Sequence, residues 1–205
     1  MLKNTTPLNS KGTIYLIEDD DMVRLSLTEA LTMVNFQVLA FSSALQFYND
    51  LENLVRPTVI VLDMQMPDMT GIELQRKLIA KKLLVPIIFI SGESYPQQII
   101  SAMKQGAVDF LLKPFLLEEL ITTIDNALIT DLNLSNCHAQ LDSLTTREKE
   151  VFGLLAKGKT SKAVAGELNI AESTIKVHKS KVMEKLQVDS LQELSLLYHR
   201  LNVFL

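Results

Sequence analysis

The 205-residue sequence has little of the chemistry on which many small proteins depend. A single cysteine, Cys137, excludes a disulfide framework and a cysteine-rich zinc site. The three histidines, His138, His178 and His199, are scattered, which argues against a histidine metal centre. Seven glycines and six prolines exclude collagen-like or low-complexity character, and 47% hydrophobic residues exclude disorder as the main state.

Long apolar runs are also missing. The longest, such as residues 83–90, have about the length of a strand and contain Pro86, so we expect no segment to span a membrane. Residues 1–12 lack the apolar core of a signal peptide. These absences predict a cytoplasmic protein.

Charge is distributed unevenly along the chain. Residues 1–142 carry 10 Lys and Arg against 17 Asp and Glu, a net charge of −7, whereas residues 143–205 carry 10 against 7, a net charge of +3. An acidic part followed by a basic part indicates two domains with different partners. The small basic part is compatible with a nucleic-acid-binding module.

The first 130 residues alternate between short apolar runs and segments with helical spacing. The runs are almost continuously apolar, which is typical of strands buried on both faces of a parallel sheet. Five strands alternating with five helices imply an α/β fold with a doubly wound five-stranded parallel sheet, whose functional site lies beyond the carboxyl ends of the strands. The expected strands are residues 13–17, 37–41, 58–62, 86–90 and 109–112, and helical stripes lie at 22–34, 71–83, about 99–103 and 117–128.

The remainder of the chain shows no strand pattern. Residues 131–142 are polar without a clear period, and we interpret them as a linker that is either flexible or an extension of the fifth helix. The spacings Thr145–Glu148 and Ser190–Glu193 are those of capping boxes. The predicted organisation is an α/β domain over 1–130, the linker over 131–142 and a small all-α domain over 143–205, with helices at about 146–157, 160–168, 172–187 and 190–203.

Reactive side chains follow four of the predicted strands. Glu18 and Asp19 follow the first strand, Asp63 the third, Ser91 the fourth and Lys113 the fifth. These positions converge in a doubly wound sheet. Carboxylates that lie close together repel unless a cation lies among them, and oxygen ligands favour a hard ion such as Mg²⁺. A carboxylate beside Mg²⁺, an ammonium and a hydroxyl can attack phosphorus and form an acyl phosphate.

Each feature also has a simpler interpretation. Asp20 and Asp21 could mark a helix start, where carboxylates interact favourably with the helix dipole. Asp63 could be a turn residue, and Lys113-Pro114 a solvated loop. The occurrence of all these side chains at strand ends, in this order, favours one shared site.

The segments IYLIEDDDMVR, VIVLDMQMPDMTGIEL, IIFISGES and GAVDFLLKPF resemble the receiver domain of two-component response regulators. The resemblance covers residues 12–130. It implies that Asp63 is the phosphoacceptor. It also implies that Glu18, Asp19, Asp63 and the backbone carbonyl of Gln65 hold Mg²⁺.

The same resemblance assigns the switching residues. Ser91 is the switch hydroxyl, Phe110 the aromatic that rotates inward with it, and Lys113 the partner of the phosphate. Pro114 stands at the usual cis-proline position of the family. Ser91 replaces the commoner Thr, and Glu18 the commoner Asp. Gln65 and Glu93 stand where residues that tune dephosphorylation are found.

Residues 159–186 contain a second pattern. A short helix ends near Leu168, and a longer helix opens at Glu172 after a turn. Lys176, Lys179 and Lys181 project from the longer helix, which suits insertion into a major groove. The simpler interpretation is a solvated basic helix face.

The segment LTTREKEVFGLLAKGKTSKAVAGELNIAESTIKVHKSKVMEKL resembles the LuxR-type helix-turn-helix domain of NarL/FixJ regulators, over about residues 141–200. His178 either packs against its own domain or contacts DNA. The resemblance places Lys176, Val177, Ser180 and Lys181 at the groove and Lys162, Thr174 and Lys179 at phosphates. It places the dimer contact at Leu194, Leu197 and Leu201, with Leu191 and Val203 in the domain's own core.

These patterns predict a non-enzymatic response regulator. A sensor histidine kinase phosphorylates Asp63, the phosphorylated protein forms a homodimer, and the dimer binds promoter DNA, with no membrane contact. One alternative is a DNA-binding regulator that ignores phosphorylation. The other is a Mg²⁺-dependent phosphohydrolase, which is disfavoured because Gln65 replaces the general-acid Asp of such enzymes and no cap domain is available.

Overall fold

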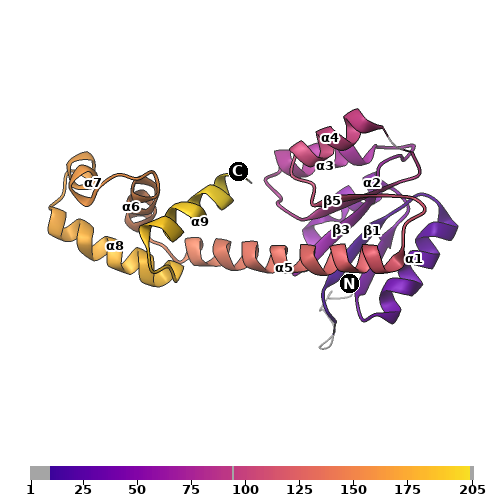
Figure 1. The fold of residues 1–205 in the computed structure, drawn as a ribbon, viewed down its shortest axis with the longest axis horizontal. Coiled ribbons are helices and arrows are strands. Elements are labelled where there is room, and N and C mark those ends of the chain that lie inside the picture. The colour runs from indigo at the N-terminus through magenta and orange to yellow at the C-terminus, as the bar shows by residue number, and fades with distance from the viewer. Residues whose placement is uncertain (1–9, 94, 204–205) are drawn as a thin grey trace. The chain divides into compact units, whose positions relative to one another are not determined.

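The structure is a computed structural model that describes residues 10–93 and 95–203. The chain divides into two compact units, residues 1–132 and 133–205. Five parallel strands in the order β2-β1-β3-β4-β5 form the sheet of the first unit, so the predicted doubly wound sheet is confirmed (Figure 1). Its elements are β1 (Thr13–Ile17), α1 (Asp21–Met33), β2 (Gln37–Phe41), α2 (Ala44–Asn49), the 3₁₀ turn η1 (Leu51–Asn53), β3 (Thr58–Asp63), α3 (Gly71–Ala80), β4 (Ile87–Ser91), α4 (Pro96–Lys104), β5 (Asp109–Leu112) and α5 (Leu117–Asp142).

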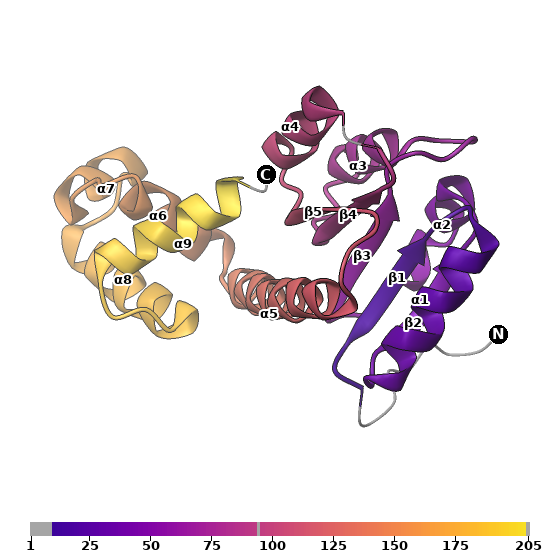
Figure 2. The same cartoon turned by 45° about the vertical axis from the view of Figure 1, so that its right-hand side comes forward.

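Helices cover both faces of this sheet (Figure 2). Successive side chains of a strand point to opposite faces. Ile14 and Leu16 therefore join the core beneath α1 and α5, whereas Tyr15 and Ile17 join the core beneath α2, α3 and α4. Burial on both faces explains why the strands are almost continuously apolar.

The helix starts follow local side-chain chemistry. Asp20 is the N-cap of α1, and its Oδ1 accepts hydrogen bonds from the N–H groups of Met22 at 2.8 Å and Val23 at 3.0 Å, which confirms the helix-start interpretation for Asp20. Thr70 and Glu73 form a capping box at α3. Helix α2 was not located from the sequence, because it has six residues and too short a stripe to show a period.

Residues 131–142 continue helix α5. Asp131 lies within this stretch, fully buried at the amino end of β3. Its Oδ2 accepts a hydrogen bond from the Thr58 N–H at 2.9 Å, and its Oδ1 pairs with the Arg56 guanidinium. A carboxylate on the inner face of the helix interrupts the apolar period, which is why the sequence did not show that the helix continues.

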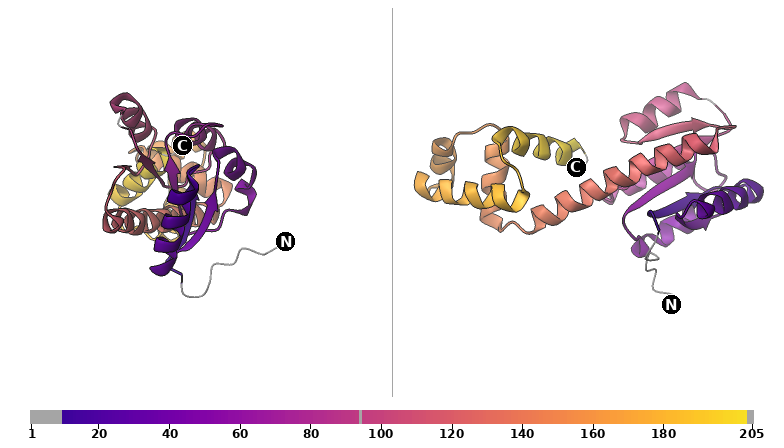
Figure 3. Two further views of the ribbon diagram at one scale, coloured as in Figure 1. Left: turned by 90° about the vertical axis from the view of Figure 1, so that its right-hand side faces the viewer. Right: turned by 60° about the horizontal axis from the view of Figure 1, so that its bottom comes forward.

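The second unit, residues 133–205, is called the helical unit below. It contains the end of α5 and four further helices around its own core (Figure 3). Asn169, in the left-handed conformation, ends the first helix of the helix-turn-helix pair. Among the described residues, no helix combines the length and the apolar character needed to cross a bilayer. The four helices are α6 (Thr146–Ala156), α7 (Ser161–Leu168), α8 (Glu172–Leu186) and α9 (Leu191–Val203), close to the expected ranges.

An ion pair between the buried Glu148 and the partly buried Lys185 joins α6 to α8. Glu148 completes a capping box with Thr145, and its Oε2 also accepts a hydrogen bond from Lys185 Nζ at 2.6 Å. Lys185 Nζ donates to the Ser143 carbonyl at 3.0 Å as well. The ammonium of Lys185 and the N–H of Thr145 lower the pKa of Glu148 to about 2. Glu148 and Lys185 thus hold α6 and α8 together.

Candidate functional site

The carboxyl ends of the strands bring three charged side chains together. Glu18 follows β1, Asp63 ends β3, and Lys113 follows β5. Lys113 Nζ lies 2.7 Å from Glu18 Oε2 and 2.7 Å from Asp63 Oδ2, so one ammonium bridges two carboxylates. The Lys113–Pro114 peptide bond is cis, as the resemblance implies.

Burial makes this cluster electrostatically unusual. Glu18 is 1% exposed, and its burial raises the pKa of its carboxyl to about 7, with Lys113 opposing the rise and Asp63 adding to it. Burial alone would lower the pKa of Lys113, but Asp63 and Glu18 outweigh it and the pKa is raised. Asp19 is exposed and supplies a third carboxylate, and the three offer oxygens within 4.8 Å of one another. Three carboxylates and one ammonium leave excess negative charge, and this donor set fits a hard divalent cation.

The backbone around Asp63 is held closely. Its Oδ1 accepts a hydrogen bond from the Gln65 N–H at 2.9 Å. The first residue of α3, Gly71, lies directly against this turn, and its N–H donates to the Met64 carbonyl at 3.1 Å. A Cβ on Gly71 would lie 2.6 Å from the Asp63 carbonyl oxygen. Glycine is therefore required where α3 approaches the end of β3.

Ser91 ends β4 beside this cluster and is fully buried. Its Oγ donates to the Glu93 carbonyl at 2.9 Å and accepts from the Glu93 N–H at 3.2 Å, so the hydroxyl is directed at its own loop. The Glu93 carboxylate accepts a hydrogen bond from the hydroxyl of Tyr95. Phe110 is partly buried against the core on the α2–α4 face.

Arg24 is a site residue that the sequence reasoning missed. Its Nη1 donates to the carbonyls of Glu18 at 2.8 Å and Asp19 at 3.3 Å, and its guanidinium pairs with Asp21. The arginine therefore fixes the backbone that carries the acidic pair. The available signal was a basic residue one helical turn after the acidic run.

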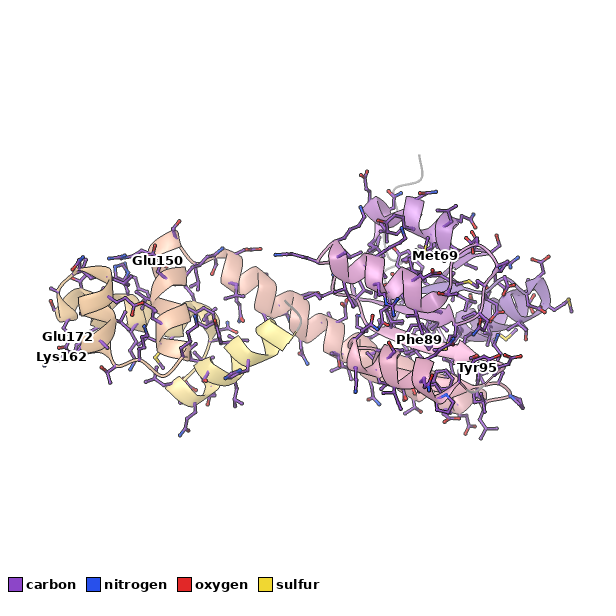
Figure 4. The ribbon with its side chains drawn as sticks, turned by 90° about the horizontal axis from the view of Figure 1, so that it is seen from above. Met69, Phe89, Tyr95, Glu150, Lys162 and Glu172 are labelled. Carbon is purple, nitrogen blue, oxygen red and sulfur yellow. The ribbon has the colours of Figure 1, made fainter. Side chains whose placement is uncertain are left out.

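The predicted DNA-contacting residues lie on α7 and α8. Figure 4 labels Lys162 of α7 and Glu172 of α8 at the same end of the helical unit. The Lys176 side chain is 69% exposed and Val177 is 55% exposed. Lys179 is partly buried. The remaining predicted contacts, Lys162, Thr174, Ser180 and Lys181, are exposed.

His178 is partly buried, and its Nδ1 is inaccessible and has no hydrogen-bond partner among the described residues. Two roles were left open for His178. The Nδ1 edge of its ring packs against its own domain.

The expected dimer contact on α9 needs correction. Leu194 is 0% exposed and Leu197 is 8% exposed, and both pack into the core of the helical unit. Leu191, expected in that core, is exposed, as is Leu196. A small helical unit has few apolar residues with which to build a core, and it uses Leu194 and Leu197 for that purpose. The side chains of Leu201 and Val203 lie outside the described residues.

Fold and site together define a class of protein: a doubly wound α/β domain with charged side chains gathered at its strand ends, joined to a helix-turn-helix unit. Two family models match the chain. Residues 14–125 match the response regulator receiver domain, and residues 142–198 match the luxR family of bacterial regulatory proteins.

Whole-length relatives carry the same combination. The chain is 36% identical over 201 residues to the response regulator protein TmoT of Ectopseudomonas mendocina, covering 95% of this chain and 91% of that protein. It is 36% identical over 191 residues to the transcriptional regulatory protein FixJ of Rhizobium meliloti, covering 89% and 92%. Full-length FixJ from B. japonicum has a similar structure, with a TM-score of 0.59, 35% identity and coverage of 94% and 98%.

The chain therefore belongs to the NarL/FixJ response regulators, which join a receiver domain to a LuxR-type DNA-binding domain. It is a transcriptional response regulator of a two-component system, and this membership implies a kinase partner and binding to DNA.

Proposed function

We propose that Asp63 accepts a phosphoryl group from the phosphohistidine of a sensor histidine kinase. A carboxylate oxygen of Asp63 attacks phosphorus, the P–O bond forms as the P–N bond breaks, and the released imidazole takes up a proton from solvent. The observation that carries the proposal is the Lys113 ammonium, 2.7 Å from Asp63 Oδ2. It stands where it can offset the charge of the incoming phosphoryl oxygens.

Glu18, Asp19, Asp63 and the backbone carbonyl of Gln65 would hold Mg²⁺. The fit rests on the oxygen-only donor set and on carboxylate oxygens within 4.8 Å of one another. When bound, Mg²⁺ would supply charge neutralisation at the phosphoryl oxygens. Arg24 would keep the acidic pair in place through its bonds to the Glu18 and Asp19 carbonyls.

The acyl phosphate would then act as a switch. Ser91 would give up its bonds to Glu93 and donate to a phosphoryl oxygen, and Phe110 would move into the space beside it. Both states exist before phosphorylation, and the modification shifts their populations. The reshaped face would favour a homodimer, and paired α8 helices would bind promoter DNA in the cytoplasm.

The DNA-contacting residues proposed on α7 and α8 are those predicted above. Exposed Lys176, Val177 and Lys181 would face the groove, and Lys162 would reach a phosphate. On α9, Leu191 and Leu196 are exposed apolar side chains that a second copy could contact. The kinase would recognise the receiver unit, in which Asp63 lies.

The test is phosphoryl uptake by full-length protein from acetyl phosphate with Mg²⁺. The variant Asp63→Asn should lose uptake, while Asp125→Asn, which changes an exposed carboxylate on α5, should behave as the unchanged protein. Full uptake by Asp63→Asn would refute the assignment. No uptake by the unchanged protein, together with unaltered promoter binding, would favour a regulator that works without phosphorylation.

A further inference from the structure

The first turn of α8 carries a carboxylate beside residues that are predicted to contact DNA. Glu172, the first residue of the helix, lies one turn before Lys176 and two turns before Ser180, both of which are predicted to face the groove. These three side chains are exposed, whereas Ile175 between the first two is buried. Figure 4 shows Glu172 at the same end of the helical unit as Lys162, another predicted contact. The carboxylate therefore belongs to the surface that would meet DNA.

Glu172 and Lys176 form an ion pair on this surface. The Oε1 atom of Glu172 lies 3.4 Å from Lys176 Nζ, and the two side chains are 45% and 69% exposed. An exposed pair one helical turn apart contributes little to the stability of a helix. The pair does, however, hold a hydrogen-bond acceptor next to a donor on the surface of α8, and such an arrangement can be matched by two neighbouring groups of a base pair.

A carboxylate on a DNA-binding surface is repelled by phosphates, unless a base edge offers it a hydrogen bond. In the major groove the available donors are N4 of cytosine and N6 of adenine. Adenine N6 lies beside N7, an acceptor that would repel a carboxylate, whereas cytosine presents N4 without a neighbouring acceptor of its own. Glu172 therefore suits cytosine. The Lys176 ammonium can only donate, so it suits O6 or N7 of guanine.

We propose that Glu172 is a specificity-determining residue, which together with Lys176 recognises one C·G base pair. The carboxylate accepts a hydrogen bond from cytosine N4, and the ammonium donates to guanine O6 or N7 of the same pair. The inference rests on the proposed function, because it requires Lys176 to face the groove. Thymine in place of the cytosine would set its O4 acceptor against the carboxylate, and we expect affinity to fall by about tenfold or more.

Selection from a randomised DNA duplex library tests the proposal. Full-length protein treated with acetyl phosphate and Mg²⁺ selects its preferred sites, and the base preference at every position is compared with that of Glu172→Gln. We expect the unchanged protein to prefer C·G at one position and Glu172→Gln to prefer A·T there, because a glutamine amide accepts from adenine N6 and donates to N7. Identical preferences at every position in the two proteins would overturn the proposal, even if Glu172→Gln bound all sites more tightly.

Glu167→Gln is the matched control. Glu167 is an exposed glutamate of α7 that pairs with Lys159, so this variant makes the same change of charge at another surface ion pair. We expect its base preferences to equal those of the unchanged protein, and the same change of preference in both variants would overturn the specific role of Glu172. Lys176→Met should weaken the preference for guanine at the same base pair. A preference lost only at other positions would count against recognition by the pair.

The same measurements separate this proposal from the one on which it rests. If the unchanged protein selects no preferred sequence, the proposed DNA contacts fail and the role of Glu172 fails with them. A preferred sequence that depends on Lys176 and is unaffected by Glu172→Gln would remove the role of Glu172 alone. Helix α8 has no side-chain N-cap, so Glu172 could instead stabilise its first turn. A lower melting temperature in Glu172→Gln, with weaker binding to all sites alike, would establish that simpler role and overturn the proposal.

Discussion

The two units of this protein use charge in opposite ways. In the receiver unit, Glu18, Asp63 and Lys113 come from three different strand ends and are largely buried. In the helical unit, Lys176 and Lys181 project from one helix into solvent. Buried charges interact strongly and depend on packing, whereas exposed charges are screened and depend mainly on helix spacing. A mutation should therefore have a large, local effect in the first unit and a small, salt-dependent effect in the second.

The largest effect is expected for Lys113→Met. Removing the ammonium takes away the charge that opposes the rise in the pKa of the buried Glu18 carboxyl, and it takes away the cation beside the incoming phosphoryl oxygens. Loss of one such stabilising group typically costs about 100-fold or more in rate. Phosphoryl uptake from acetyl phosphate measures this, with Lys104→Met, at the exposed end of α4, as the matched control. A loss of less than about tenfold would show that the buried pair matters less than its geometry suggests.

A somewhat smaller effect, on stability, is expected for Asp131→Ala. The change removes the acceptor of the Thr58 N–H and the buried partner of Arg56. Leaving the buried Thr58 N–H without its acceptor should lower the free energy of unfolding of the receiver unit by about 2 kcal/mol. Chemical denaturation monitored in the receiver unit of the intact protein gives the value. Asp125→Ala, at an exposed ion pair on the same helix, should cost less than about 1 kcal/mol. Equal losses in the two variants would contradict the contrast between buried and exposed charge.

The exposed lysines should behave as screened charges. Lys162→Ala is expected to weaken binding to all DNA sequences alike and to reduce the slope of log affinity against log salt concentration by about 1. Binding titrations at several salt concentrations measure the slope. Lys157→Ala, an exposed lysine at the end of α6 outside the predicted contacts, is the control. A loss confined to one DNA sequence would instead assign Lys162 to base recognition.

The most subtle effect concerns pH and the ion pair between the buried Glu148 and the partly buried Lys185. The pKa of Glu148 is lowered to about 2 in the folded protein from an ordinary value of 4.5. Its stabilising contribution is therefore complete above about pH 4.5 and is lost as the pH falls towards 2. Calorimetry of the intact protein should show that Glu148→Gln flattens the pH dependence of the helical unit's melting temperature in this window. Glu150→Gln, at an exposed glutamate on the same helix, should leave the slope in place.

Some residues of the candidate site could be predicted from the sequence, and others could not. The identities of Asp63 and Lys113 were visible because strand periodicity and sheet topology bring strand ends together. The role of Arg24 was not predicted, since its hydrogen bonds go to main-chain carbonyls, and a basic residue one turn after an acidic run does not by itself show which groups it contacts. Gly71 is a similar case, because only the approach of α3 to Asp63 shows that a side chain there would collide.

The error on α9 has a physical cause. A leucine stripe on a short helix suits a domain core and a dimer contact equally well, and its sequence spacing is the same for both. Packing against α6 assigned Leu194 and Leu197 to the core and left Leu196 outside.

By itself, the sequence determined the alternation of strands and helices, the capping of α6 and the kind of chemistry at the strand ends, because these depend on neighbouring residues and on general rules of chain topology. Only the tertiary structure decided that Glu148 pairs with Lys185, that Asp131 is buried at the amino end of β3, and which face of α9 is exposed. Those outcomes depend on how distant segments pack, and close packing is a property of the folded chain as a whole.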